Sequence, residues 1–152
     1  MIAAGEPAPD FTLPDQDGEK VSLADFRGAK LLLVFYPQDF SPVCADQLSI
    51  YQEVKPEIEA GGVRMVGVSV DHGFAHKAFR EKLGIDTRLL CDFEPKGEVA
   101  RAYGAYIEEC GHANRSLVLV DEEGVVEWVH ESPTPLEIPG ANLIFDALGS
   151  DR

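Results

Sequence analysis

The sequence predicts an α/β domain of three layers, in which a mixed central sheet has helices on both faces. Apolar runs of strand length alternate with segments of helical periodicity through the middle of the chain, which indicates parallel strands joined by helices. A strand–turn–strand pattern follows and adds antiparallel pairing to the sheet. The 152 residues contain no internal repeat and no Gly/Ser linker, so we expect one domain over residues 1–152.

The first elements follow from a turn signal and a run of apolar residues. Asp17-Gly18 separates two short β-like runs, which predicts an N-terminal hairpin. The run KLLLVFY, Lys30–Tyr36, is continuous and apolar, as expected of a central strand that is buried on both faces. Apolar residues at three- and four-residue spacing then predict a helix over residues 43–60, which Gly61-Gly62 ends.

The later elements are predicted by the same signals. β-branched and aliphatic runs indicate strands, glycines end two of the helices, and Glu123-Gly124 marks the turn of the closing hairpin. In chain order we expect a strand over 63–71, a helix over 74–84, a strand over 87–92, a helix over 98–104, a hairpin over 116–130 and a C-terminal helix over 140–150.

Composition and charge are those of a soluble globular protein, with 45% hydrophobic and 26% charged residues. Acidic residues outnumber basic ones by 27 to 13, and the net charge of −14 argues against a nucleic acid or an anionic membrane as partner. No apolar stretch approaches the roughly 18 residues of a membrane span. The first residues lack the features of a secretory signal, so we expect a cytoplasmic protein.

The stretch FYPQDFSPVC joins the central strand to the first helix and ends in a cysteine. Pro42 lies where the first helical turn begins, and Ser41 before it is a candidate N-cap. Cys44 therefore falls in the first turn, where free N–H groups and the positive end of the helix favour a thiolate. The alternative is an inert buried cysteine that packs as a small hydrophobe.

The pattern P-x-x-x-S-x-x-C, formed by Pro37, Ser41 and Cys44, resembles the active-site motif of the peroxiredoxins, where threonine is more common than serine. The segments PAPDFTL and NRSLVLVD are similar to other parts of that family, and the second contains Arg115 just before a strand. The resemblance covers nearly the whole chain. Within the family it is strongest to the alkyl hydroperoxide reductase E type, with the bacterioferritin-comigratory or Q-type proteins as near neighbours.

This resemblance implies a thioredoxin-like fold and a thiol peroxidase that needs no metal or organic cofactor, with hydrogen peroxide and organic hydroperoxides as substrates. The Cys44 thiolate would attack one peroxide oxygen and become a sulfenic acid. Arg115 would stabilise the thiolate and the charge that develops as the O–O bond breaks. Ser41 and backbone N–H groups near Val43 would bind the peroxide oxygens, and Pro37 would keep bulk water from the pocket.

Two features of this interpretation stay open. Only the resemblance brings Arg115 near Cys44, and the alternative for an arginine at this point of the chain is a surface ion pair. Gln47 stands where the family often has glutamate. A neutral amide can hydrogen-bond the arginine but does not pair with its charge.

The sequence leaves two routes open for reduction of the sulfenic acid, one through an external thiol and one through a second cysteine of the chain. Ser49 occupies one position where Q-type relatives carry a resolving cysteine, and the helix over 74–84 contains no cysteine either. We favour a one-cysteine cycle in which an external thiol reduces Cys44; the resemblance implies a mycoredoxin-, thioredoxin- or glutaredoxin-like protein or a low-molecular-weight thiol. The main rival is a disulfide with Cys110, expected in an exposed loop, and Cys91 is less favoured because we expect it to be buried.

Other functions have weaker support. His72 and His76 are four residues apart and Cys110 and His112 two apart, but a metal site needs three or four converging ligands, so we expect solvated histidines and no metal. A thioredoxin-like disulfide reductase would need a CxxC motif, which Cys44 does not begin. A non-catalytic scaffold or chaperone on the same fold is a distant alternative. The resemblance also implies a homodimer.

Overall fold

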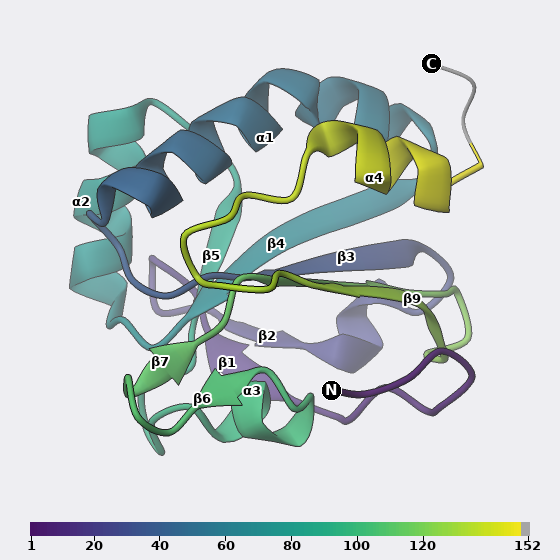
Figure 1. The fold of residues 1–152 in the computed structure, drawn as a ribbon, viewed down its shortest axis with the longest axis horizontal. Coiled ribbons are helices and arrows are strands. Elements are labelled where there is room, and N and C mark those ends of the chain that lie inside the picture. Colours follow the sequence, from purple (N-terminus) through teal and green to yellow (C-terminus); the bar gives the residue numbers. More distant parts are fainter. Residues whose placement is uncertain (150–152) are drawn as a thin grey trace.

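The computed structural model describes residues 1–149 and has a five-stranded sheet at its centre, with the longer helices on one side (Figure 1). The strands of this sheet are β3 (Lys30–Phe35), β4 (Val63–Ser69), β5 (Arg88–Cys91), β8 (Ser116–Val120) and β9 (Val126–Glu131). The helices are α1 (Pro42–Ala60), α2 (Gly73–Leu83), α3 (Glu98–Ala102) and α4 (Ala141–Ala147), and η1 (Leu23–Phe26) is a 3-10 helix. The predicted mixed α/β fold is confirmed.

The order of strands places β3 in the middle of the sheet. The order is β5-β4-β3-β8-β9, with β3, β4 and β5 parallel and with β8 and β9 antiparallel to their neighbours. Leu33 in β3 lies opposite Val66 in β4 and Val118 in β8. The carboxyl ends of the three parallel strands meet at one edge, where ligand sites form in open α/β sheets. Both α1 and α2 begin at this edge.

Alternate side chains of β3 face two separate layers of the core. Leu33 belongs to the cluster beneath the hairpin, η1 and α3, whereas Val34 packs under α1 and α4. Each is at most 1% exposed. A third cluster lies at the carboxyl end of β3, between the starts of α1 and α2, and contains Tyr36, Cys44, Leu48, Phe79, Ile85 and Leu89. Cys44, the candidate nucleophile, is therefore packed among apolar side chains.

The N-terminal hairpin and a second, smaller hairpin complete the fold. Strands β1 (Thr12–Pro14) and β2 (Lys20–Ser22) form the predicted hairpin, and β6 (Tyr106–Ile107) pairs with β7 (His112–Ala113) where only a loop was expected. The helix predicted over 98–104 ends at Ala102, before Gly104 at a φ of +74°. The C-terminal helix ends at Ala147, and residue 150 of its predicted range lies outside the described residues.

Helix length and polarity bear on membrane insertion. None of the helices within residues 1–149 is both long and apolar enough to cross a bilayer.

Candidate active site

The first turn of α1 is organised around Ser41 and Cys44. Ser41 is the N-cap of α1 in extended conformation, and Pro42 takes the first helical position, where no N–H is needed. The Ser41 hydroxyl accepts a hydrogen bond from the Cys44 backbone N–H at 3.4 Å. The Cys44 side chain is fully buried, at 0% exposure. The thiol therefore sits at the positive end of a helix, which favours negative charge, whereas its burial away from bulk water works in the opposite direction.

Arg115 is the cation of the site. It lies immediately before β8, is 1% exposed, and each of its three nitrogens has a different partner. Nη2 donates to Cys44 Sγ at 3.4 Å, Nη1 to Gln47 Oε1 at 2.7 Å, and Nε to the carbonyl oxygen of Pro135 at 2.7 Å. No carboxylate within residues 1–149 forms an ion pair with this guanidinium. The surface ion pair considered for Arg115 is therefore wrong, and its charge faces the sulfur.

The segment between β9 and α4 lies against the same site. Besides the Pro135 carbonyl on Arg115, the carbonyl of Pro139 accepts a hydrogen bond from the Tyr51 hydroxyl at 2.6 Å. Burial raises the pKa of Tyr51 to about 12, so this hydroxyl keeps its proton and remains a donor. Gln47 lies one turn before Tyr51 on the buried side of α1. The positions of Arg115 and α1 are thus fixed by a loop distant from both in sequence.

A buried pair formed by Asp39 and His76 was not predicted from the sequence, and the expectation that His76 is solvated is wrong. This histidine was expected to be solvated, yet it is 0% exposed and lies 2.7 Å from Asp39, with Nδ1 facing the carboxylate. Its Nε2 lies 2.9 Å from the carbonyl oxygen of Leu90. Asp39 belongs to the loop that ends at Ser41. No local sequence pattern indicates this contact, because the two residues are 37 positions apart in sequence.

Metal binding has one candidate group among residues 1–149, formed by Asp39, Asp71 and His76, whose ligand atoms lie within 4.8 Å of one another. The second pair considered from sequence, Cys110 and His112, does not join it. Because both nitrogens of His76 face oxygen acceptors, both carry protons and neither has a lone pair for an ion. The group is better described as a hydrogen-bonded ion pair.

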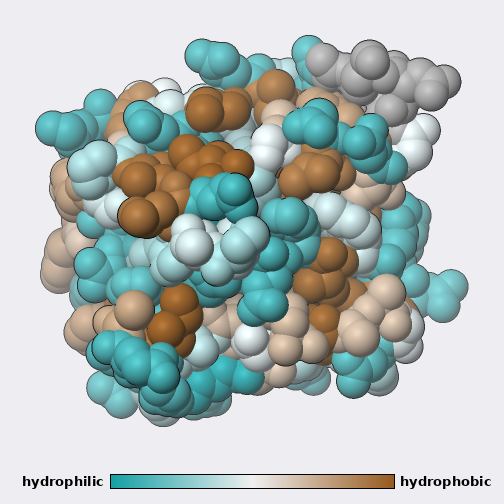
Figure 2. All heavy atoms as spheres, viewed as in Figure 1, coloured by the Kyte–Doolittle hydropathy of each residue, from teal (hydrophilic) through white to brown (hydrophobic). Residues whose placement is uncertain are grey.

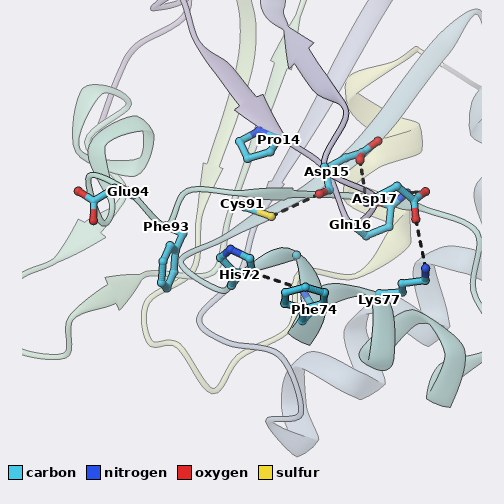
Figure 3. Close-up of a pocket in the computed structure, with 12 residues that line it drawn as sticks. Pro14, Asp15, Gln16, Asp17, His72, Phe74, Lys77, Cys91, Phe93 and Glu94 are labelled. Carbon is cyan, nitrogen blue, oxygen red and sulfur yellow. Dashed lines mark hydrogen bonds and ion pairs between the residues drawn. The ribbon is translucent and has the colours of Figure 1, made fainter.

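Cys91 lies at the end of β5 in the floor of a different cavity. The thiol is 3% exposed and donates to the backbone carbonyl of Asp15 at 3.6 Å. The pocket around it, about 390 Å³, lies between the turn of the N-terminal hairpin and the start of α2 (Figure 3). Figure 3 shows the rings of His72, Phe74 and Phe93 side by side along this pocket. Cys44 does not line it.

Cys110 and Pro37 complete the residues singled out from sequence. Cys110 is exposed in the turn between β6 and β7, where its N–H donates to the carbonyl of Ile107. All three cysteines are free thiols, so the structure joins Cys110 to neither of the others. Pro37 is buried two residues after the end of β3, in the loop that leads to Ser41. The structure brings Cys44, Ser41 and Arg115 together and leaves Cys110 apart.

The chemical character of the site follows from these contacts. A thiol at a helix N-terminus, beside a guanidinium without a carboxylate partner, is suited to react as an anion. The donors around it can stabilise negative charge that develops on a bound oxygen. The side chains provide no pair of cysteines for disulfide exchange at this point.

Comparison with known proteins gives the family. The AhpC/TSA family model matches residues 4–129. The chain belongs to the AhpC/TSA family. It is 38% identical over 151 residues to alkyl hydroperoxide reductase E of Mycobacterium bovis, covering 99% of this chain and 98% of that protein. It is 34% identical over 134 residues to the putative peroxiredoxin bcp of Coxiella burnetii, covering 84% and 87% of the two chains. This peroxiredoxin is therefore an enzyme, a thiol peroxidase.

Solved structures agree with the fold of this peroxiredoxin. Peroxidoxin BcpB from Mycobacterium tuberculosis superposes with a TM-score of 0.87 at 25% identity, over 100% of this chain and 99% of that one. AhpC of Enterococcus faecalis gives a TM-score of 0.89 at 28% identity, over 98% and 92%. The predicted similarity to the alkyl hydroperoxide reductase E and Q-type groups is confirmed, and with it the need for a peroxide substrate and a thiol reductant.

Proposed function

We propose that Cys44 is the peroxidatic cysteine of this enzyme and that Arg115, Ser41 and Pro37 form the rest of its site. The observation that carries the proposal is the Arg115 guanidinium 3.4 Å from Cys44 Sγ, in a buried position at the start of a helix. The thiolate attacks one peroxide oxygen, an S–O bond forms, and the O–O bond breaks. The leaving hydroxide or alkoxide takes a proton, and Cys44 is left as a sulfenic acid.

The surrounding groups have separate roles in this step. The Arg115 guanidinium stabilises the thiolate and then the negative charge on the departing oxygen. The Ser41 hydroxyl, which already accepts from the Cys44 N–H, can turn its own proton toward a bound peroxide oxygen. Pro37 is part of the buried wall of the loop. We propose hydrogen peroxide and organic hydroperoxides as substrates and an antioxidant role in the cytoplasm.

We further propose a one-cysteine cycle in which an external thiol reduces the sulfenic acid. A first thiol attacks the Cys44 sulfur, releases water and forms a mixed disulfide, and a second thiol restores Cys44. Cys110 supports the rival cycle less well, because it lies exposed in a hairpin turn while Cys44 is fully buried. Cys91 is buried and bonded to Asp15. A mycoredoxin-, thioredoxin- or glutaredoxin-like protein, or a low-molecular-weight thiol, is the proposed reductant.

Intact mass after one equivalent of hydrogen peroxide tests this proposal. The reduced protein should gain one oxygen or, with a sulfenic-acid trap present, an adduct located on Cys44. Loss of two hydrogens would indicate an internal disulfide and would contradict the one-cysteine cycle. A Cys44→Ser variant that still consumed peroxide would contradict the role of Cys44, whereas a Cys110→Ser variant should behave as the unmodified protein.

We propose that the enzyme is a homodimer whose interface borders the site. Large hydrophobic side chains are exposed close to it: Phe40 in the loop before Ser41 is 50% exposed, Ile50 on α1 is 44% exposed, and Leu136 beside Pro135 is 76% exposed. Figure 2 shows hydrophobic side chains gathered over the amino-terminal part of α1, with smaller hydrophobic areas among hydrophilic side chains elsewhere on the same face. Apolar patches of this kind mark interaction surfaces. Sedimentation equilibrium should give twice the chain mass, and a Leu136→Asp variant should weaken the association.

A further inference from the structure

We propose that Asp39, His76 and Tyr36 are positioning residues of the peroxidase, whose buried hydrogen bonds hold loop 37–41 so that Cys44 faces Arg115. This inference rests on the proposed role of Cys44. We call the three side chains the Asp39 cluster. None of them is a sequence neighbour of Arg115, and none contacts Cys44 Sγ through a hydrogen bond.

Asp39 is held from several sides at once. Its two carboxylate oxygens accept from the Tyr36 hydroxyl at 2.6 Å and from His76 Nδ1 at 2.7 Å. Its backbone N–H donates to the Asp71 carboxylate at 2.8 Å, and Asp71 also accepts from the Ser69 hydroxyl. The loop is thereby tied to the end of β3, to α2 and to the residues that follow β4.

Within the Asp39 cluster, the positive charge of His76 lies opposite the negative charge of Asp39. His76 faces oxygen acceptors with both ring nitrogens, so it donates from both and carries a positive charge opposite the Asp39 carboxylate. Burial lowers the pKa of His76, but the hydrogen bond to Asp39 and the negative charge of this carboxylate raise it more, to about 10. A buried carboxylate without this partner would be strongly unfavourable. The pair therefore persists at neutral pH as part of the folded loop.

Loop 37–41 depends on the hydrogen bonds of Asp39 because its backbone is strained at the next residue, Phe40. Phe40 has a φ of +69°, a left-handed conformation that L side chains rarely adopt, and the side chain is half exposed. Such a conformation persists only where neighbouring contacts enforce it. Asp39 supplies the contacts on one side of Phe40, and Ser41, as the N-cap of α1, supplies them on the other.

The cluster is connected to the sulfur by short links. The ring of Tyr36 packs in the same apolar cluster as Cys44, while its hydroxyl bonds Asp39. Two residues after Asp39, the Ser41 hydroxyl accepts from the Cys44 N–H. The Arg115 to Sγ distance of 3.4 Å leaves little room for a shift of the first turn. Release of Asp39 would let Phe40 relax and would move Ser41 and Cys44 away from Arg115.

A double-mutant cycle of Asp39→Asn and His76→Gln tests the inference. The rate of Cys44 oxidation by hydrogen peroxide and the thiolate fraction at pH 7, from alkylation of the Cys44 peptide, are measured for each variant. Each single variant leaves a buried charge unpaired, and we expect an oxidation rate lower by about tenfold or more together with a smaller thiolate fraction. The double variant removes both charges, so its loss should be smaller than the product of the single losses.

Two further variants separate positioning from loss of folding. Tyr36→Phe keeps the ring in the core and removes only the hydroxyl. It should slow oxidation of Cys44 by roughly threefold, and the variant should still unfold in one cooperative transition. His130→Asn, on the edge strand β9, is the matched histidine control and should change neither quantity. If Asp39→Asn does not fold, the Tyr36→Phe and His76→Gln results decide.

The outcomes are distinguishable from failure of the proposed function. If Cys44 of the unmodified protein is not the oxidised residue, the proposed function itself is wrong. If Cys44 is oxidised normally and the cluster variants show the unmodified rate and thiolate fraction, only the positioning inference is overturned. Strictly multiplicative losses in the double variant would also overturn it, because they would show that Asp39 and His76 act independently.

Discussion

Each nitrogen of Arg115 has its own partner, an arrangement that a side chain with one charged nitrogen cannot reproduce. The planar guanidinium reaches a sulfur, an amide oxygen and a backbone carbonyl at once. The ammonium of lysine is a single point charge with no fixed fork of donors. Loss of any one contact would leave a buried acceptor without a donor.

Arg115→Lys should therefore abolish most of the peroxidase activity. We expect the rate constant for Cys44 oxidation to fall by about a hundredfold or more, because charge stabilisation at the reacting atoms is usually the largest catalytic term. Stopped-flow oxidation with hydrogen peroxide measures this. Arg101→Lys, at an exposed arginine that pairs with Glu108, is the control and should retain full activity.

Gln47 allows the charge near the sulfur to be changed without changing the shape of the site. A Gln47→Glu variant would pair with Arg115 and place a negative charge close to the thiolate, which favours the neutral thiol. We expect a lower thiolate fraction at pH 7 and an oxidation rate reduced by roughly three- to tenfold. Gln47→Met removes the acceptor without adding charge. Equal thiolate fractions in the two variants would contradict an effect of charge.

At the residue scale, local patterns predicted only part of the site. Pro42, Ser41 and Cys44 follow one another around a helix start, so their arrangement could be predicted from the stretch itself. Arg115 lies 71 residues from Cys44, and only the resemblance to a family indicated the contact. The Asp39 to His76 contact gave no such signal, because an acid and a histidine far apart in sequence are most often exposed.

At the scale of elements, the parallel strands β3, β4 and β5 decide where α1 and α2 begin. These elements were predicted well because short apolar segments rich in Leu and Val indicate strands of a sheet that is buried on both faces. Strands β6 and β7 were missed since two-residue pairings are set by tertiary contacts rather than by a pattern. The site depends on the well-predicted elements.

Gly67 tests how closely β4 must approach its surroundings. A Cβ at this residue would lie 2.7 Å from the Leu89 side chain and 3.1 Å from the Tyr36 ring. Gly67→Ala should lower the free energy of unfolding by about 1–3 kcal/mol through overpacking. It should also slow Cys44 oxidation, because Tyr36 lies in the apolar cluster with Cys44.

Urea unfolding and peroxide kinetics measure both effects of Gly67→Ala. Gly61→Ala is the matched control, because a Cβ there would meet only the Ile58 carbonyl, at 3.4 Å. Its φ of −83° is allowed for alanine, so stability should change by less than about 0.5 kcal/mol. Equal effects of the two substitutions would show that β4 tolerates a larger side chain.

At the scale of the whole molecule, the buried pair of His76 and Asp39 links stability to pH. The pKa of His76 is raised from 6.5 to about 10 in the folded protein, so between these values the native state binds a proton that the unfolded state has released. Stability from this proton is complete below pH 6.5 and is lost as the pH rises toward 10. Its size is on the order of a few kcal/mol.

Urea unfolding at pH 6, 8 and 10 measures this dependence. The unmodified protein should lose stability steadily over the range, whereas His76→Asn should be less stable at pH 6 and should lose less as the pH rises. His130→Asn should follow the unmodified protein. A parallel decline in His76→Asn would assign the loss to other groups, such as the lysines that pair with Glu127 and Asp86.

The contacts of Pro135 and Pro139 reach beyond the region that the family model matches, which stops at residue 129. A fragment trimmed to that shared region would keep both the cysteine and the arginine in its sequence but lose the two carbonyls that align the guanidinium and α1. Exchange of the carboxyl-terminal segments between related enzymes should therefore change the rate at which Cys44 is oxidised, although Cys44 and Arg115 themselves stay the same. The region that the family model matches therefore lacks two of the contacts that hold Arg115 and α1 in place.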